Sequence, residues 1–130
     1  MKILQPPDWP RPKGYSNGIV ARGTHVILSG IVGWNEKEEF ETDDFAGQVS
    51  QVLRNIVLLL EQADAKPEHL VRLTWYITNC DEYLNALKTI GADYREIIGR
   101  HYPTMAVVEV SALIEDGAKV EIEATAIIPD

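Results

Sequence analysis

Two glutamates near the end of the chain have the spacing of paired carboxylates. Glu121 and Glu123 are separated by one apolar residue, so in a strand both project from the same face of a sheet. Paired carboxylates can serve as general acid and general base when they line a cleft. On an open sheet face they are simply solvated, as most charged side chains are. The pair is therefore a candidate site only where that face lies in a cleft between copies of the chain.

The other groups that could carry chemistry do not form a known arrangement. The three histidines are far apart in the sequence and have no nearby set of cysteine or acidic ligands. Ser29 lacks the Gly-x-Ser-x-Gly context of a serine nucleophile. The glycine-rich segment 14–18 precedes an expected strand, whereas a phosphate-binding loop opens a helix. These patterns predict no metal and no cofactor.

The elements that must position these groups fit one domain. The chain has 130 residues, and we place the domain at 1–130 with a proline-rich N-terminal arm at 1–13. Apolar residues that alternate predict strands, and apolar residues that recur every three to four positions predict helices. In chain order we expect a hairpin of strands 19–22 and 25–29, a helix from 43 to about 65, a strand at 70–79, a helix that Asp81 caps and Gly99 ends, and strands at 105–112 and 119–125. This order predicts an α+β fold with a mixed sheet and both helices on one face.

The last two strands are expected to pair with each other across a longer loop. A tight turn at Asp116 and Gly117 would set polar residues against apolar ones, so we expect a bulge or extra loop residues there. The matching register places Glu123 beside Met105. The sheet face that no helix covers then carries Met105 and Val107 among its polar residues. A half-apolar open face on a small domain predicts self-association.

Charge and composition exclude several classes of partner. Twelve Lys and Arg residues against twenty Asp and Glu residues give a formal charge of −8. This balance disfavours binding to nucleic acid or to an anionic membrane surface. No apolar run approaches the roughly 20 residues of a membrane-spanning helix. Cys80 is the only cysteine, which excludes an intrachain disulfide and suits a reducing compartment. We therefore expect a cytoplasmic protein with no nucleic-acid and no membrane partner.

Four short segments together resemble a known family. They are Gly14-Tyr15-Ser16-Asn17, Ser29-Gly30 at the end of a strand, Val108-Glu109-Val110, and Val120-Glu121-Ile122-Glu123-Ala124. In this order and spacing the chain resembles, over nearly its whole length, the reactive intermediate deaminases of the RidA/YjgF family. The resemblance implies a chorismate-mutase-like domain of the bacillus type that forms a homotrimer, with a small imine, enamine or carboxylate ligand in the clefts between subunits. Members of that family hydrolyse enamines and imines to 2-keto acids and ammonia.

The resemblance also implies roles for individual residues. Tyr15 corresponds to the cleft tyrosine that orients the substrate, and Glu123 corresponds to the carboxylate that positions or activates water. Backbone groups of Gly30 and Ile31 would bind the ligand. Lys88 stands where some members carry a cleft asparagine.

The chain departs from the family pattern at Met105. Family members carry an arginine two residues after the proline that corresponds to Pro103, and this arginine clamps the substrate carboxylate through paired hydrogen bonds. Methionine offers neither a charge nor a donor. Three hypotheses therefore stay open. The chain is a hydrolytic enamine or imine deaminase with little activity on the usual 2-imino acids, a non-catalytic trimer that binds a small metabolite or has a regulatory role, or a structural subunit.

Overall fold

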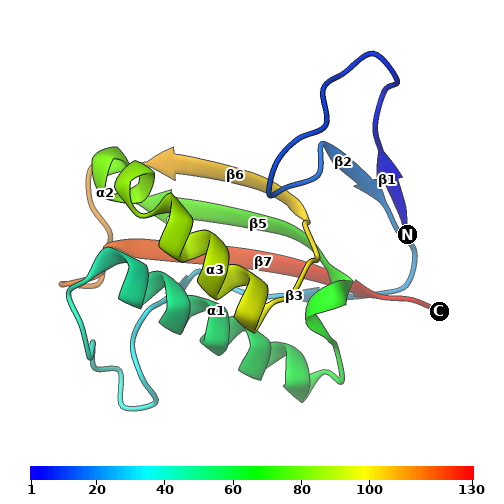
Figure 1. Cartoon of the computed structure of the whole chain (residues 1–130). Coiled ribbons are helices and arrows are strands. Elements are labelled where there is room, and N and C mark those ends of the chain that lie inside the picture. The colour runs from blue at the N-terminus through cyan, green and yellow to red at the C-terminus, as the bar shows by residue number, and fades with distance from the viewer.

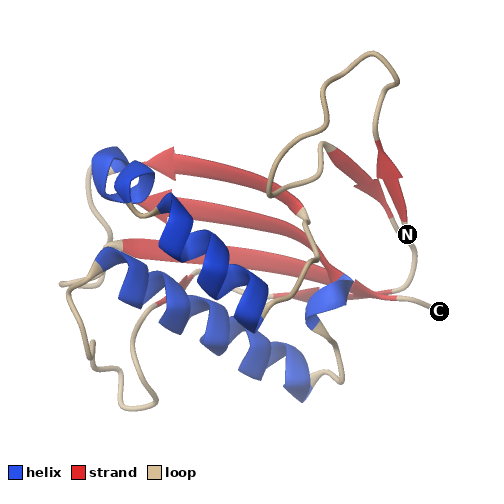
Figure 2. Cartoon of the chain, viewed as in Figure 1, coloured by secondary structure: helices blue, strands red, loops and turns tan.

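The computed structural model describes residues 1–130 as a mixed sheet with helices against one face (Figures 1 and 2). The strands are β1 (Lys2–Leu4), β2 (Gly18–Val20), β3 (Thr24–Ile27), β4 (Ile31–Val32), β5 (Leu70–Ile77), β6 (Thr104–Glu109) and β7 (Val120–Ile128). The helices are α1 (Phe45–Gln62), α2 (Cys80–Asn85) and α3 (Leu87–Ile97), with a 3-10 turn η1 (Pro67–His69). The main sheet has the order β3-β7-β5-β6, and β4 also pairs with β7. The predicted α+β class and the one-sided helical layer are confirmed.

Helix α1 supplies most of the apolar surface under the sheet. Its N-terminus begins after Asp44, whose side chain accepts a hydrogen bond from the backbone N–H of Gly47 at 2.9 Å. Its apolar stripe is fully buried, with Leu53, Ile56 and Leu60 among the least exposed residues of the chain. The expected helix from position 43 is thus present, with its N-cap one residue later.

The second expected helix is two helices. Asn79, rather than Asp81, caps α2, and its side chain accepts from the backbone N–H of Glu82 at 3.0 Å. Ala86, at φ −104° and ψ 4°, then leaves helical geometry and separates α2 from α3. Three α-helices therefore cover the sheet where two were predicted. The break redirects the chain, so that α2 and α3 both face the end of the sheet formed by β5 and β6 (Figure 1).

The predicted hairpin of strands 19–22 and 25–29 does not form. Strand β2 pairs with β1 in a separate two-stranded sheet, and β3 pairs with β7. The chain crosses between the two sheets at Gly23, which has a φ of +143°. A Cβ placed on Gly23 would lie 1.8 Å from the carbonyl oxygen of Ile128, so only glycine fits there. Part of the expected N-terminal arm is consequently a paired strand.

The predicted pairing of the last two strands is also wrong. Strand β5 lies between β6 and β7, parallel to β6 and antiparallel to β7. Leu73 of β5 pairs with both Met105 and Ala124. The next residue, Thr74, points to the opposite face of the sheet and pairs with Glu123. Met105 and Glu123 therefore lie on opposite faces of the sheet, because neighbouring residues of a strand point to opposite faces. Met105 belongs to the face that the helices cover, and the open face carries the glutamates.

Candidate functional site

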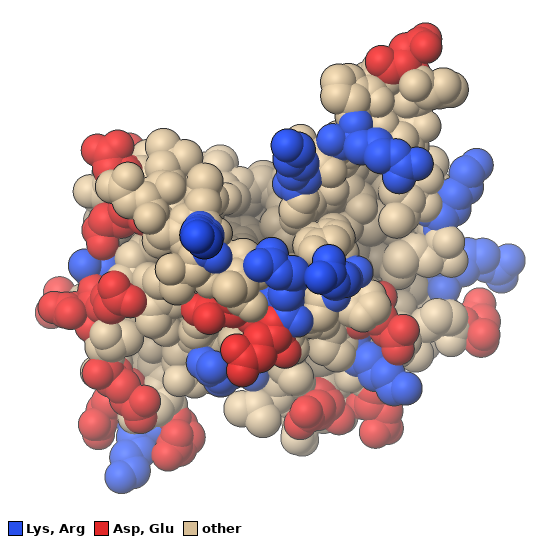
Figure 3. Space-filling view, in the orientation of Figure 1, with Lys and Arg blue, Asp and Glu red and all other residues tan.

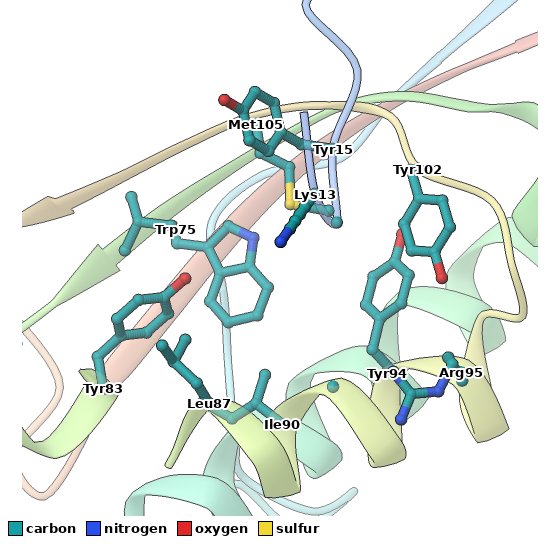
Figure 4. A pocket seen from close by; sticks show the side chains of 13 residues that line it. Lys13, Tyr15, Trp75, Tyr83, Leu87, Ile90, Tyr94, Arg95, Tyr102 and Met105 are labelled. Atoms are coloured by element: carbon teal, nitrogen blue, oxygen red, sulfur yellow. The ribbon is translucent and has the colours of Figure 1, made fainter. Parts of the chain in front are cut away.

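A cleft of about 640 Å³ opens between the sheet and the two short helices. Strands β5 and β6 form its floor, α2 and α3 form one wall, and the loop before β2 reaches its rim (Figure 4). Most of the residues around it are hydrophobic. A concave, mainly apolar cleft with a few polar groups is typical of small-molecule sites.

The floor of the cleft comes from alternate residues of two paired strands. Trp75 on β5 pairs with Val107 on β6, and Met105 lies two residues before Val107 on the same face. Trp75 is 3% exposed and packs edge-on against Tyr83 of α2, with ring centres 6.2 Å apart. Its indole nitrogen is buried and donates to no acceptor in the protein. The floor thus combines the flexible side chain of Met105 with the rigid ring of Trp75, whose buried indole N–H is a donor without a partner.

Three tyrosines form the walls of the cleft. Tyr94 stacks on Tyr102 with ring centres 5.9 Å apart, and its hydroxyl donates to the backbone carbonyl of His101. Burial, followed by the charge of a nearby Tyr102 phenolate, raises the pKa of Tyr94, and burial raises the pKa of Tyr83. Both phenols therefore stay protonated at neutral pH and can donate hydrogen bonds but cannot serve as bases.

The rim carries two positive charges. Lys13 and Tyr15 reach it because Ser16 is anchored on the sheet edge, where its backbone N–H donates to the carbonyl of Pro103 at 3.0 Å. Arg95 reaches it from α3, with its guanidinium lying over Gly91. No aspartate or glutamate lines the cleft, so within one chain the charged groups there are cations.

The structure brings together two of the residues that the sequence predicted for the site. Tyr15 and Met105 both line the cleft. Lys88 does not line it, although its neighbour Leu87 does; the Lys88 side chain is exposed on α3. The predicted ligand-binding role of Lys88 has no support in the geometry of a single chain.

The remaining predicted residues lie elsewhere in the chain. Glu123 is on the open face of the sheet, where it accepts a hydrogen bond from the hydroxyl of Tyr76 at 2.8 Å. That hydrogen bond is the main cause of a raised pKa at Tyr76. Gly30 lies against Glu121, since a Cβ on Gly30 would be 2.4 Å from its Oε2, and Ile31 pairs with the next residue of β7. One chain therefore holds the predicted site residues in two separate places.

Sequence reasoning missed three residues of the cleft. Trp75 lies in the strand predicted at 70–79, and the alternating pattern of a strand does not show that its indole N–H lacks a partner. Lys13 stands next to the recognised Gly14–Tyr15 segment, which is the signal that could have found it. Arg95 follows Gly91 by one helical turn, and only the folded helix shows that the glycine leaves space for it.

Two further properties of the structure bear on its chemistry. No group of three or more histidine, cysteine or acidic side chains is placed to hold a metal ion. None of the helices combines the length and hydropathy that crossing a bilayer requires.

Comparison with known proteins identifies the family. The family model described as "Endoribonuclease L-PSP" matches residues 10–128. The chain belongs to the RidA/YjgF family. A RutC family protein of Aquifex aeolicus is 32% identical over 98% of this chain and 99% of its own length. The 2-iminobutanoate/2-iminopropanoate deaminase of Escherichia coli is 32% identical over 81% of this chain and 80% of its own length.

Solved structures of Rid proteins share the fold. The Rid protein YyfB of Yersinia pestis, whose function is unknown, superposes with a TM-score of 0.83 at 29% identity, covering 98% of each chain. TdcF of E. coli with bound serine superposes with a TM-score of 0.68 at 29% identity, covering 98% of this chain and 99% of its own. The Rid family thus includes deaminases and a member that holds a small amino acid.

Proposed function

We propose that this Rid protein hydrolyses the C=N bond of a small reactive imine or enamine and releases ammonia. The observation that carries the proposal is the placing of Tyr15 and Met105, two positions of the family pattern, in one concave cleft of a chain related to deaminases. Water adds to the C=N carbon, the nitrogen gains protons, and the C–N bond breaks to leave a carbonyl compound and ammonia. The cleft must therefore hold the substrate, orient a water molecule and move protons.

The cleft of one chain lacks a group that can accept a proton from water. Tyr83 and Tyr94 have raised pKa values and stay protonated, and the charged residues of the cleft are the cations Lys13 and Arg95. Carboxylates are available on the open sheet face, at Glu121 and Glu123. We place the complete site between neighbouring copies of a homotrimer, with Tyr15 contributed by one chain and a β7 carboxylate by the next. The uncovered sheet face and the exposed apolar side chains of Ile27 and Val108 support self-association.

Met105 sets the expected substrate range. It replaces the arginine that would clamp the carboxylate of a small 2-imino acid, and one charge-assisted hydrogen bond contributes about 1.5–3 kcal/mol. Turnover of 2-iminopropanoate and 2-iminobutanoate should therefore be weak. The formal charge of −8 disfavours a phosphate-backbone substrate, despite the description of the matching family model. A cytoplasmic location, where imines arise from amino-acid metabolism, fits this role.

Imine hydrolysis can be tested by generating 2-iminobutanoate and its homologues within the assay mixture, with an amino-acid oxidase, and by following the release of keto acid. The protein should accelerate release from at least one imine, and the Glu121→Gln and Glu123→Gln variants should show which carboxylate is required. Met105→Arg should raise the activity on 2-iminobutanoate. Solution mass should equal three times the 14.6 kDa of one chain.

The lost arginine favours a second function, a trimer that binds a metabolite without turnover. Absence of turnover on every imine, with a ligand still bound in the cleft, would replace the deaminase proposal by this one. A monomer at micromolar concentration would contradict the shared site in both cases.

A further inference from the structure

The buried indole N–H of Trp75 is a donor without a protein partner inside the cleft. Less than 1 Å² of its nitrogen is exposed, and it is the one buried side-chain nitrogen or oxygen that makes no hydrogen bond. A buried donor without an acceptor lowers stability, so such groups in folded proteins commonly serve a ligand or a water molecule. In Figure 4 the nitrogen is directed toward the part of the cavity where Lys13 and Met105 enter. Because the nitrogen is enclosed, a ligand in the cleft reaches this donor when a side chain that covers it moves aside.

The charges around the cleft oppose the charge of the molecule. The chain carries −8 overall, yet the charged residues that line this cleft are Lys13 and Arg95. The two ion pairs of the chain involve neither of them, so both charges are free to act on a ligand. Figure 3 shows Lys and Arg atoms gathered around the hollow in this face of the molecule. A positive rim above an apolar pocket attracts an anion and strengthens its hydrogen bonds.

The part of the cleft beyond the Trp75 indole is large and has aromatic walls. A volume of about 640 Å³ exceeds the need of a three- or four-carbon imino acid and falls in the range of sites for larger organic ligands. In Figure 4 the open space lies between Trp75 and the stacked pair of Tyr94 and Tyr102, with Ile90 beneath it. Flat rings pack favourably against such walls by edge-to-face or offset stacking.

We propose that the cleft binds an aromatic carboxylate, and that its natural substrates are 2-imino acids with an aromatic side chain. The carboxylate accepts a hydrogen bond from the Trp75 indole and pairs with Lys13, while the ring lies between Trp75 and Tyr94. The cation that Met105 cannot supply from β6 thus comes from the N-terminal loop. Met105 covers this region with a side chain that has three rotatable bonds and yields to the ligand. This inference rests on the proposed function only in taking this cleft as the substrate site.

Nuclear magnetic resonance of the full chain with ¹⁵N-labelled tryptophan tests the contact directly. The chain has three indole N–H groups, at Trp9, Trp34 and Trp75. The probe is 3-phenylpropanoate, which has the ring and the carboxylate but no C=N bond to hydrolyse. Its addition should shift the Trp75 resonance and leave that of Trp34 in place. The Trp75 resonance is assigned by its loss in the Trp75→Phe variant. If Trp75→Phe does not fold, the Trp9→Phe and Trp34→Phe variants assign the other two resonances and leave the third to Trp75.

Two analogues separate the contributions of ring and charge. Propanoate lacks the ring and 3-phenylpropan-1-ol lacks the charge, so each should bind at least tenfold more weakly than 3-phenylpropanoate. Lys13→Met should weaken 3-phenylpropanoate binding about fivefold or more. Arg11→Met is the matched control, because Arg11 lies on the same segment but does not line this cleft. Arg95→Ala should have a smaller effect than Lys13→Met, since Arg95 enters the cleft from α3 on the side of Tyr94 and Lys13 enters beside Trp75 (Figure 4).

The results that overturn the inference differ from those that overturn the proposed function. An unmoved Trp75 resonance, or equal binding of the acid and the alcohol, contradicts the aromatic-carboxylate site even if small imines are hydrolysed. Binding of 3-phenylpropanoate without hydrolysis of any imine contradicts the deaminase and leaves the site standing.

Discussion

Replacing Gln48 by methionine should destabilise the fold by removing a buried hydrogen-bonded junction. Gln48 is fully buried in α1. Its Nε2 donates to the carbonyls of Thr42 at 3.1 Å and Gly117 at 2.9 Å, and its Oε1 accepts from the N–H of Lys119 at 2.8 Å. One side chain thus joins the loop before the helix, the helix and the start of β7. Methionine has a similar length and volume but makes none of these bonds.

The size of the effect follows from the three groups left behind. A typical hydrogen bond contributes about 1 kcal/mol net, and a buried group left without a partner costs about 1–3 kcal/mol. Thr42 and Lys119 are half-buried and Gly117 is exposed, so water can replace part of the three lost bonds. We expect Gln48→Met to lower the free energy of unfolding by about 3–5 kcal/mol. With a urea slope of about 2 kcal/mol per molar, the midpoint falls by roughly 1.5–2.5 M.

Gln51→Met on the same helix is the control for this measurement. The Gln51 amide donates only to the side chain of Asn55, one turn further along, and such pairs contribute about 0.5 kcal/mol or less. Both variants must be unfolded at the same protein concentration, because association shifts the midpoint. A loss below about 1 kcal/mol for Gln48→Met, or an equal loss for both variants, would refute the assignment of the junction to these three bonds.

Three further predictions concern the cleft and its borders. Gly91→Ala should raise the free energy of unfolding by about 0.5–1 kcal/mol in urea, because its Cβ would meet only the mobile Nη1 of Arg95 at 3.3 Å; a decrease would show that Arg95 is fixed. The fold raises the pKa of Tyr94, so the unfolded chain loses the phenol proton first and the free energy of unfolding should fall as the pH rises above about 10. In Tyr94→Phe this fall should be less steep. Melting curves over a pH series measure it, and an equal fall in melting temperature for both proteins would contradict the argument. Desolvation, followed by the hydrogen bond with Glu109, raises the pKa of the Cys80 thiol, so Glu109→Gln should speed alkylation by iodoacetamide at pH 8, and an unchanged rate would speak against that contact.

The residues that share a face were predictable, but the neighbours of each strand were not. The alternation in β6 placed Met105 and Val107 on one side, and the structure keeps them together. Which side this is depends on β5 lying between β6 and β7, a long-range arrangement that no local pattern records. For that reason Met105 was placed beside Glu123, although the two lie on opposite faces.

The site was predictable only where a motif marked it. Tyr15 was found through the Gly14-Tyr15-Ser16-Asn17 segment, and its position depends on Ser16 bonding to the backbone of Tyr102, 86 residues away. Lys13 shares this anchoring but belongs to no motif. The two places that hold Tyr15 and Glu123 within one chain can form one site only by assembly, and a single sequence does not specify the geometry of that assembly.

The position of β7 in the sheet has a consequence for how the protein is made. This strand is the last of the seven along the chain, yet it lies between β3 and β5 and pairs with both. At 5–20 residues per second, a ribosome needs roughly 5 to 20 s between completing β3 and reaching β7. During that time β3 has no partner, and from the completion of β5 at Ile77 one edge of β5 also has none; both are open to pairing with other chains. We therefore expect a nascent chain that completes its fold only after β7 emerges, and strong dependence on chaperones when translation stalls before it.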